Sequence, residues 1–208
     1  MESTVTQTSG KLRIKVIIGS TRPSRFSERP ARYIYEELCK IENVDAELVD
    51  LRDYPIPFYN GLVPPARGGG KYDDKILTDW ANKIHDGDAF IMVTPEYNHG
   101  YPAILKNAID VIFPEWNHKA IGFVSYGNAG GARAIEQLVQ VAVEMRLVPI
   151  AKSINIPIEI YRNAMSEPSI ENSQAMAQLR TGIRGDIVHM FFDELLWMAT
   201  ALKAARKL

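Results

Sequence analysis

The sequence predicts an α/β fold: a doubly wound, five-stranded parallel sheet in a three-layer sandwich. Two observations support this prediction. Short apolar runs rich in β-branched residues alternate with segments whose apolar residues recur at helical spacing, the pattern of a βαβ protein. The first strand-like run, Leu12 to Ile18, is also mostly apolar, as expected of a strand covered on both faces. Right-handed crossovers then leave few topologies, of which the order 2-1-3-4-5 is the simplest.

The first three elements follow from their local pattern. Residues Leu12 to Ile18 form a β-branched run and are predicted to be a buried strand. The stretch from Ser27 to Ile41 has helical spacing, with Ser27 available as the N-cap and Pro30 in the first turn, where a missing N–H is tolerated. Val44 to Leu51 alternates like a second strand.

A long Pro/Gly-rich loop interrupts the alternation in the middle of the chain. It spans Pro55 to Asp74, and a structureless loop of this length in a compact domain is commonly functional or interfacial. After it we expect a helix from Lys75 to His85, a strand from Ala89 to Val93 and a helix from Ala103 to Ile112.

The last third of the chain continues the same pattern. Ile121 to Ser125 is the fourth predicted strand, Ala132 to Arg146 the next helix and Leu147 to Ile156 the fifth strand. Pro157 to Ser173 is expected to be a second loop, followed by a long final helix that ends at about Lys203.

Composition limits the class of protein. Residues 1–11 are polar and are predicted to be a disordered tail rather than a secretory signal. Residues 12–208 are predicted to form one domain. No apolar run approaches the roughly 20 residues of a membrane span, and the net charge of −1 does not favour nucleic acid or an anionic membrane as partner. Cys39 is the single cysteine, so no internal disulfide can form. We expect a cytoplasmic protein without a metal site.

In open α/β sheets, ligands bind at the carboxyl ends of the strands, and three loops at this edge carry polar residues. The first, GSTRPSRFS, follows strand 1 from Gly19 to Ser27. Its backbone N–H groups, with the hydroxyls of Ser20, Thr21 and Ser27, predict a concave anion site to which Arg22 adds a charge. This pattern is neither a Walker loop nor the G-x-G-x-x-G of a dinucleotide fold.

The second loop follows strand 3, which is expected to break at Pro95. Its sequence, TPEYNHGYPAILKNAID from Thr94 to Asp110, contains Asn98 and Gly100, which favour a tight turn. Such a turn places backbone groups against the edge of a planar heterocycle, and Tyr97 is available to cover part of its face.

The third loop, SYGNAGGARA, runs from Ser125 to Ala134 after strand 4. Its glycines let the chain approach a ligand closely, and Tyr126 is placed to pack beside a ring. The positive end of the following helix is expected to face the same cleft, which suits an anionic group.

Each loop also has an ordinary structural explanation. The first is then a capped helix with a solvated arginine. The second is a strand-to-helix connection in which Glu96 and His99 are solvated, and the third is a flexible turn. Three such loops at one edge of a sheet favour a ligand site more strongly than any one of them alone.

These motifs resemble the NADPH-dependent FMN reductases, a family that includes flavin-dependent quinone and azo-dye reductases. The resemblance covers roughly residues 12–156, and PEYNHGYPAILKNAID is its most specific part. It implies a flavodoxin-like fold with bound FMN, NADPH or NADH as reductant, and a homodimer or homotetramer with the flavin near the subunit interface. It assigns the phosphate to Ser20, Arg22 and Ser27, and the flavin ring to Pro95, Glu96, Tyr97, Asn98, Ser125, Tyr126 and Gly127. Arg25 is a second arginine in the phosphate loop, and the family pattern favours Arg22.

The expected activity is therefore hydride transfer from NAD(P)H, through bound FMN, to a small acceptor such as a quinone, an azo compound or free flavin. The flavin performs the redox chemistry, so no catalytic side chain is required, and His99 and Tyr97 are the nearest proton donors. The backbone around Gly127 is expected to stabilise the charge that develops on the ring. Arg67 and Arg162 are examples of loop arginines that could select NADPH over NADH.

Three other functions stay open from the sequence. The first is a non-catalytic electron carrier, which typically needs a strongly charged docking surface that a net charge of −1 does not favour. The second is a flavin-based redox sensor module, which steady-state turnover would separate from an enzyme. The third is a hydrolase using Ser20 or Ser125, which ranks last because no G-x-S-x-G elbow surrounds either serine.

Overall fold

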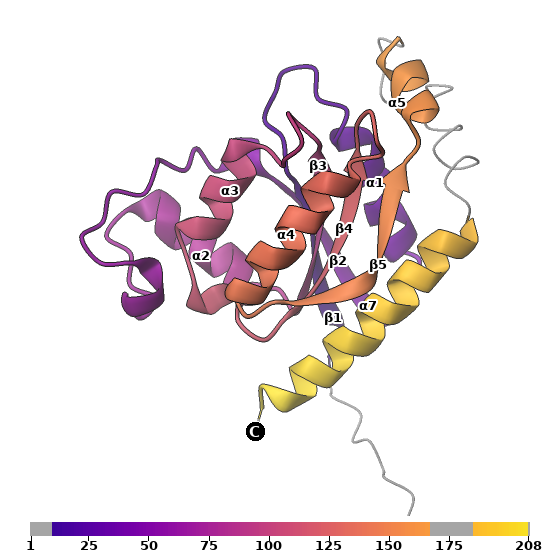
Figure 1. Cartoon of the computed structure of the whole chain (residues 1–208). Helices are drawn as coiled ribbons and strands as arrows, with labels where there is room; N and C mark the ends of the chain where they lie inside the picture. Colours follow the sequence, from indigo (N-terminus) through magenta and orange to yellow (C-terminus); the bar gives the residue numbers. More distant parts are fainter. Residues whose placement is uncertain (1–9, 167–184, 208) are drawn as a thin grey trace, which may run out of the picture.

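The computed structural model describes residues 10–166 and 185–207, and Figure 1 shows its arrangement. A single parallel sheet runs through the middle in the order β2-β1-β3-β4-β5. Its strands are β1 (Leu12–Ile18), β2 (Val44–Asp50), β3 (Ala89–Pro95), β4 (Ala120–Tyr126) and β5 (Val148–Ile156). The predicted flavodoxin-like topology is confirmed.

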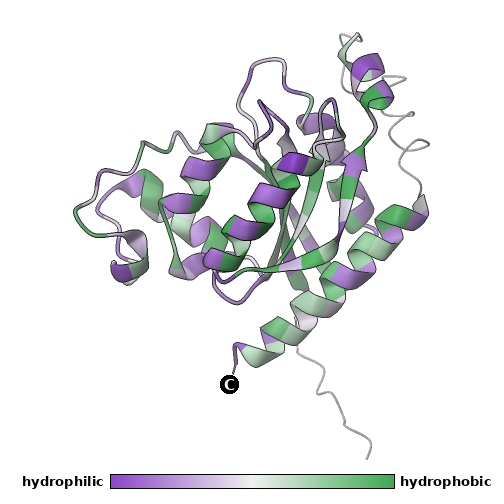
Figure 2. Ribbon diagram, viewed as in Figure 1, coloured by the Kyte–Doolittle hydropathy of each residue, from purple (hydrophilic) through white to green (hydrophobic). Residues whose placement is uncertain are grey.

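Helices cover both faces of this sheet, which gives the predicted three layers (Figure 1). They are α1 (Glu28–Leu38), α2 (Lys75–Asp86), α3 (Ala103–Asp110), α4 (Ala132–Glu144), α5 (Ile158–Met165) and α7 (Gly185–Ala205). Helices α1, α5 and α7 pack in one apolar cluster with the strands, and α2, α3 and α4 pack in another on the opposite face. Figure 2 shows the strands mostly green and the helices banded in purple and green, as expected where each helix buries one side.

The central strands have the burial pattern that is typical of a parallel sheet. Every residue of β3 and β4 is buried, so both faces need an apolar cover. On one face, Trp80 and Trp116 are fully buried, and each indole N–H donates to a carbonyl of α3, which satisfies its only polar atom. On the other face, Phe191 of α7 lies so close to Gly122 that a Cβ there would be 2.5 Å from its ring.

Strand β3 ends at Pro95, where the sequence predicts a break, and so extends two residues beyond the predicted end at Val93. The Val93 carbonyl accepts a hydrogen bond from the Gly19 N–H, while the Glu96 N–H donates to Tyr126 on the opposite side. The backbone nitrogen of Pro95 therefore points toward β1, which has already ended at Ile18. Its missing N–H costs no ladder hydrogen bond there.

The second expected loop, from Pro157, was also partly wrong, because Ile158–Met165 forms helix α5. Ile160 and Ala164 are buried on its inner side, and this i, i+4 pair is a helical signal that the sequence contained. Residues 167–173 of that expected loop lie outside the described residues. The final helix ends at Ala205, near the predicted Lys203.

The two ends of the described chain are joined by a hydrogen bond. Residues 1–9 of the expected tail lie outside the described part, and the Lys11 carbonyl accepts a hydrogen bond from Lys203 of α7 at 2.9 Å. A single domain over residues 12–208 stays a prediction. None of the described helices is long and apolar enough to cross a membrane.

Candidate functional site

A cleft opens at the carboxyl edge of the sheet, where β3 and β4 end. Its volume of about 400 Å³ is within the range of roughly 300–1,000 Å³ typical of small-molecule sites. The lining comes from all three sequence-predicted loops and from α5: Arg22, Pro95, Glu96, Tyr97, Asn98, His99, Tyr126, Gly127, Asn128, Arg133 and Tyr161. The topology thus brings together seven of the ten predicted site residues.

The two arginines of the first loop have different environments. Arg22 is exposed at the cleft, with its Cζ atom 5.6 Å from the centre of the Tyr97 ring, and no described carboxylate is within ion-pair distance of it. Arg25 is buried and ion-paired with Asp50 and Glu28, and it also donates to the Ser20 carbonyl at 2.8 Å. Arg25 therefore holds the loop to the end of β2, while the charge of Arg22 is free to meet an anion.

The two predicted phosphate-binding serines are bonded to tyrosines behind the cleft wall. Ser20 Oγ lies 3.1 Å from the Tyr97 hydroxyl, and Ser27 Oγ lies 2.7 Å from the Tyr126 hydroxyl, which also accepts from the Ser27 N–H at 3.1 Å. Both serines are at most 1% exposed. Ser27 is the N-cap residue of α1, as predicted, but its side chain makes no cap hydrogen bond, because its hydroxyl is bonded to Tyr126 of β4, 99 residues away.

Tyr126 is part of an aromatic wall rather than an exposed platform. Its ring is 3% exposed and packs edge-on against Phe26, with the ring centres 4.8 Å apart, and beside Tyr161 at 5.3 Å. Burial raises the pKa of the Tyr126 hydroxyl well above its usual value. The hydroxyl is therefore neutral at physiological pH.

The turn after β3 is as tight as the sequence predicts. Asn98 and His99 both have positive φ angles, as a type I′ turn requires, and Tyr97 and Gly100 exchange two backbone hydrogen bonds of 2.7 and 3.0 Å. Asn and His are among the residue types most often found in this conformation.

His99 is exposed, as the ordinary explanation of this loop expects, but Glu96 is not solvated, so that part of the explanation was wrong. The Glu96 side chain is 5% exposed, and one oxygen forms an ion pair with Arg133 Nη2 at 2.8 Å while the other accepts from the Arg133 N–H at 3.1 Å. Arg133 Nη1 lies 2.6 Å from His99 Nε2. The amino end of α4, expected to face a ligand, therefore already carries a carboxylate.

Ser125 shapes the third loop from behind. It is fully buried, donates to the Gly130 carbonyl at 2.7 Å and accepts from Asn155 at 3.1 Å. Gly131 has a φ of +78° and lies so close that a Cβ would be 2.5 Å from that of Ser125. Of the three predicted site residues in this loop, Tyr126 and Gly127 line the cleft and Ser125 does not.

Residues 12–159 match the family model described as NADPH-dependent FMN reductase. The chain belongs to this family. An NAD(P)H-dependent FMN reductase of Schizosaccharomyces pombe is 35% identical over 181 residues, which cover 86% of this chain and 90% of the relative. Another, from Saccharomyces cerevisiae, is 30% identical over 186 residues, covering 83% and 97%.

A solved structure supports the fold of this family member independently. The flavoenzyme NAD(P)H:(acceptor) oxidoreductase FerB of Paracoccus denitrificans superposes with a TM-score of 0.65 at 20% identity. The match covers 90% of this chain and 98% of that one. At this identity the likeness bears on the fold alone.

Three cleft residues of this FMN reductase family member were not assigned by sequence reasoning: Asn128, Arg133 and Tyr161. Asn128 and Arg133 lie within the third motif, and their position beside glycines that reach the cleft was a usable signal. Tyr161 was missed because the helical spacing of α5 was not recognised.

Gly131 gives a test of how tightly the third loop packs. In Gly131→Ala we expect a loss of unfolding free energy of about 1–2 kcal/mol for the left-handed backbone, and about 1–3 kcal/mol more for the clash with Ser125. Gly69→Ala is the matched control, since Gly69 also has a positive φ but nothing within 4 Å of its Cβ position. Urea denaturation measures both, and equal losses would contradict the close packing.

Proposed function

We propose that this chain is an FMN-dependent NAD(P)H oxidoreductase that reduces a small acceptor such as a quinone, an azo compound or free flavin. The observation that carries the proposal is the cleft itself, which joins the unpaired guanidinium of Arg22, the Tyr97 ring and the backbone at Gly127 around one cavity. Family membership supports the same activity.

The residues present fit a flavin mononucleotide. Arg22 supplies a charge for the phosphate, and the segment from Pro95 to Asn98 supplies the edge along which the ring would lie. Gly127 allows close approach of the backbone, because a side chain there would need a φ of +153° and would meet Glu96 at 3.0 Å. Ser20, Ser27 and Ser125 support these groups from behind rather than line the cleft.

When bound, FMN accepts a hydride from a nicotinamide and returns reducing equivalents to a second substrate. The chain's own part is binding, orientation and exclusion of water. The aromatic cluster of Phe26, Tyr126 and Tyr161 closes one wall, and the tight turn at Tyr97 fixes the opposite rim. We assign no catalytic side chain.

The test is spectroscopic. Purified protein is supplied with FMN, its visible spectrum is recorded, and NADPH or NADH is added without oxygen. We expect a bound flavin that either nicotinamide bleaches rapidly and that a quinone, an azo compound or free flavin re-oxidises. A flavin that binds without being reduced would favour an electron carrier or sensor. No flavin binding at excess FMN would overturn the proposal.

We also propose a cytoplasmic homodimer or homotetramer, with the Pro55–Asp74 loop in the interface. Phe58 and Leu62 of this loop are 80% and 103% exposed, while Asn107 anchors the start of the loop by donating to the carbonyls of Ile56 and Pro57. Apolar side chains held out in this way are typical of interaction surfaces.

In the double variant Phe58→Asp, Leu62→Asp we expect the sedimentation coefficient to fall to that of a smaller species, because two charges would be buried in the interface. Val143→Asp is the matched control, since Val143 is 62% exposed but lies on α4. A wild-type monomer, or an unchanged assembly in the double variant, would contradict the proposed interface.

A further inference from the structure

Glu96 is a nearly buried carboxylate in the wall of the proposed flavin site. Only 5% of its side chain is exposed, and its neighbours along the chain, Pro95 and Tyr97, line the same cleft. A carboxylate in a low-dielectric wall acts strongly on any charge that develops nearby. It contributes a fixed negative charge beside the position proposed for the ring.

The positive charge that balances Glu96 comes from Arg133 and from the amino end of α4. Arg133 provides both the N–H at 3.1 Å and the guanidinium at 2.8 Å. That guanidinium is shared, because Nη1 lies 2.6 Å from His99 Nε2, and its buried Nε has no hydrogen-bond partner among the described residues. The amino end of α4 therefore does not present a free positive pole to the cleft.

The cation on the other side of the cleft is Arg22, which lies over the Tyr97 ring and beside the loop proposed for the phosphate. The tyrosines that complete the wall, Tyr126 and Tyr161, supply no positive charge to offset Glu96, because a phenol has no cationic form in water. The Glu96 carboxylate, paired with Arg133, directly precedes the Tyr97–Gly100 turn that would hold the ring edge.

We propose that the Glu96–Arg133 pair sets the reduction potential of FMN bound in the cleft. This inference rests on the proposed function. NAD(P)H gives up one hydride, which consists of two electrons and one proton, and leaves as NAD(P)⁺. The bound FMN therefore gains one negative charge. Glu96 opposes that charge and holds the potential down, whereas Arg133 limits the effect.

The experiment measures the midpoint potential of bound FMN by equilibration with reference dyes in four proteins. Glu96→Gln should raise the potential, because it removes the opposing charge. Arg133→Gln should lower it, because it removes the compensating one. Glu136→Gln, which removes a carboxylate from an exposed position on the same helix, should leave it at the wild-type value, because solvent screens that charge.

Opposite shifts separate an electrostatic role from a merely structural one, since a loosened turn would move both variants in the same direction. If Glu96→Gln fails to fold or to bind FMN, the comparison of Arg133→Gln with Arg133→Lys decides. Lysine keeps the charge and should restore the potential. Parallel shifts, or none, in a wild type that binds FMN and is reduced by NAD(P)H would overturn this inference alone. A wild type that binds no FMN would overturn the proposed function.

Discussion

In Arg22→Ala, the dissociation constant for FMN is expected to rise about 10- to 100-fold while the free energy of unfolding stays near that of the wild type. A hydrogen bond to a charged group contributes roughly 1.5–3 kcal/mol, and about 1.4 kcal/mol corresponds to a factor of ten. Arg22 is exposed and lacks a carboxylate partner in the described part of the chain, so its loss leaves no buried charge behind. Fluorescence titration at fixed ionic strength measures the effect.

Arg25→Ala should have the opposite profile. Removing this buried guanidinium leaves the Asp50 carboxylate without its ion-pair partner, whereas Glu28 keeps Arg32, and breaking a buried pair costs about 3–5 kcal/mol of unfolding free energy. Arg67→Ala, an exposed loop arginine outside the cleft, is the control and should change neither quantity. If Arg25→Ala folds normally and weakens FMN binding more than Arg22→Ala does, the assignment of the phosphate to Arg22 is wrong.

The contrast between these arginines shows what a single sequence can predict. The loop, its position after β1 and its excess of positive charge are local properties, and all three were predictable. The division of labour between Arg22 and Arg25 was not, because it depends on Asp50, a residue that the topology of β1 and β2 brings beside the loop.

The same distinction holds across the fold and the site. Apolar runs predicted all five strands, and the rule of right-handed crossovers predicted their order. β3 and β4 are buried throughout, whereas the edge strands β2 and β5 are partly exposed. Ser27 occupies the predicted N-cap position, but its hydroxyl makes no cap hydrogen bond, because it is bonded to Tyr126, which is far away in sequence. The α4 amino end was predicted to be free for a ligand, but Glu96 reaches it across the carboxyl edge of the sheet. Local propensity was outweighed wherever a long-range polar partner was available.

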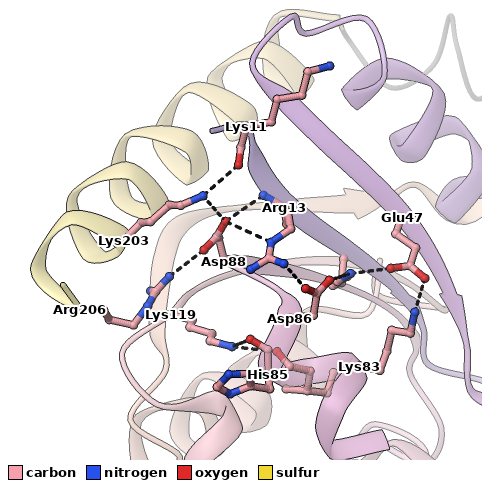
Figure 3. A network of polar contacts seen from close by, with 12 residues as sticks. Lys11, Arg13, Glu47, Lys83, His85, Asp86, Asp88, Lys119, Lys203 and Arg206 are labelled. Carbon is pink, nitrogen blue, oxygen red and sulfur yellow. Dashed lines mark hydrogen bonds and ion pairs between the residues drawn. The ribbon is translucent and has the colours of Figure 1, made fainter. Parts of the chain in front are cut away.

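A charged network at the opposite edge of the sheet joins α7 to the strands (Figure 3). At its centre is Asp88, whose side chain is 7% exposed. Its carboxylate accepts from the Arg13 N–H at 3.0 Å, from Lys203 at 2.6 Å and from Arg206 at 3.0 Å. Lys203 is in the last turn of α7, and Arg206 follows the end of that helix. The Asp88 side chain, just before β3, therefore fixes the end of α7 to β1 and β3.

Asp88→Ala should lower the free energy of unfolding by about 3–5 kcal/mol, because it leaves two largely buried cations without the carboxylate that neutralises them. The control is Asp79→Ala. Asp79 forms an exposed i, i+4 pair with Lys75, so its loss should cost less than about 1 kcal/mol. Urea denaturation is the appropriate measurement, since guanidinium salts would screen both pairs.

The effect of Asp88 should also depend on pH in a defined direction. Burial alone would raise the pKa of this carboxyl, but the Lys203 hydrogen bond and the Arg13 contacts outweigh it and hold the pKa below its usual value. A carboxyl with a lower pKa in the folded state stabilises the protein above its unfolded pKa of about 4, and that contribution is lost as the pH falls through the folded value. The difference in stability between the wild type and Asp88→Asn should therefore be complete at neutral pH and shrink as the pH falls below about 4. A difference that grows on acidification would show that Asp88 does not hold α7 through its charge.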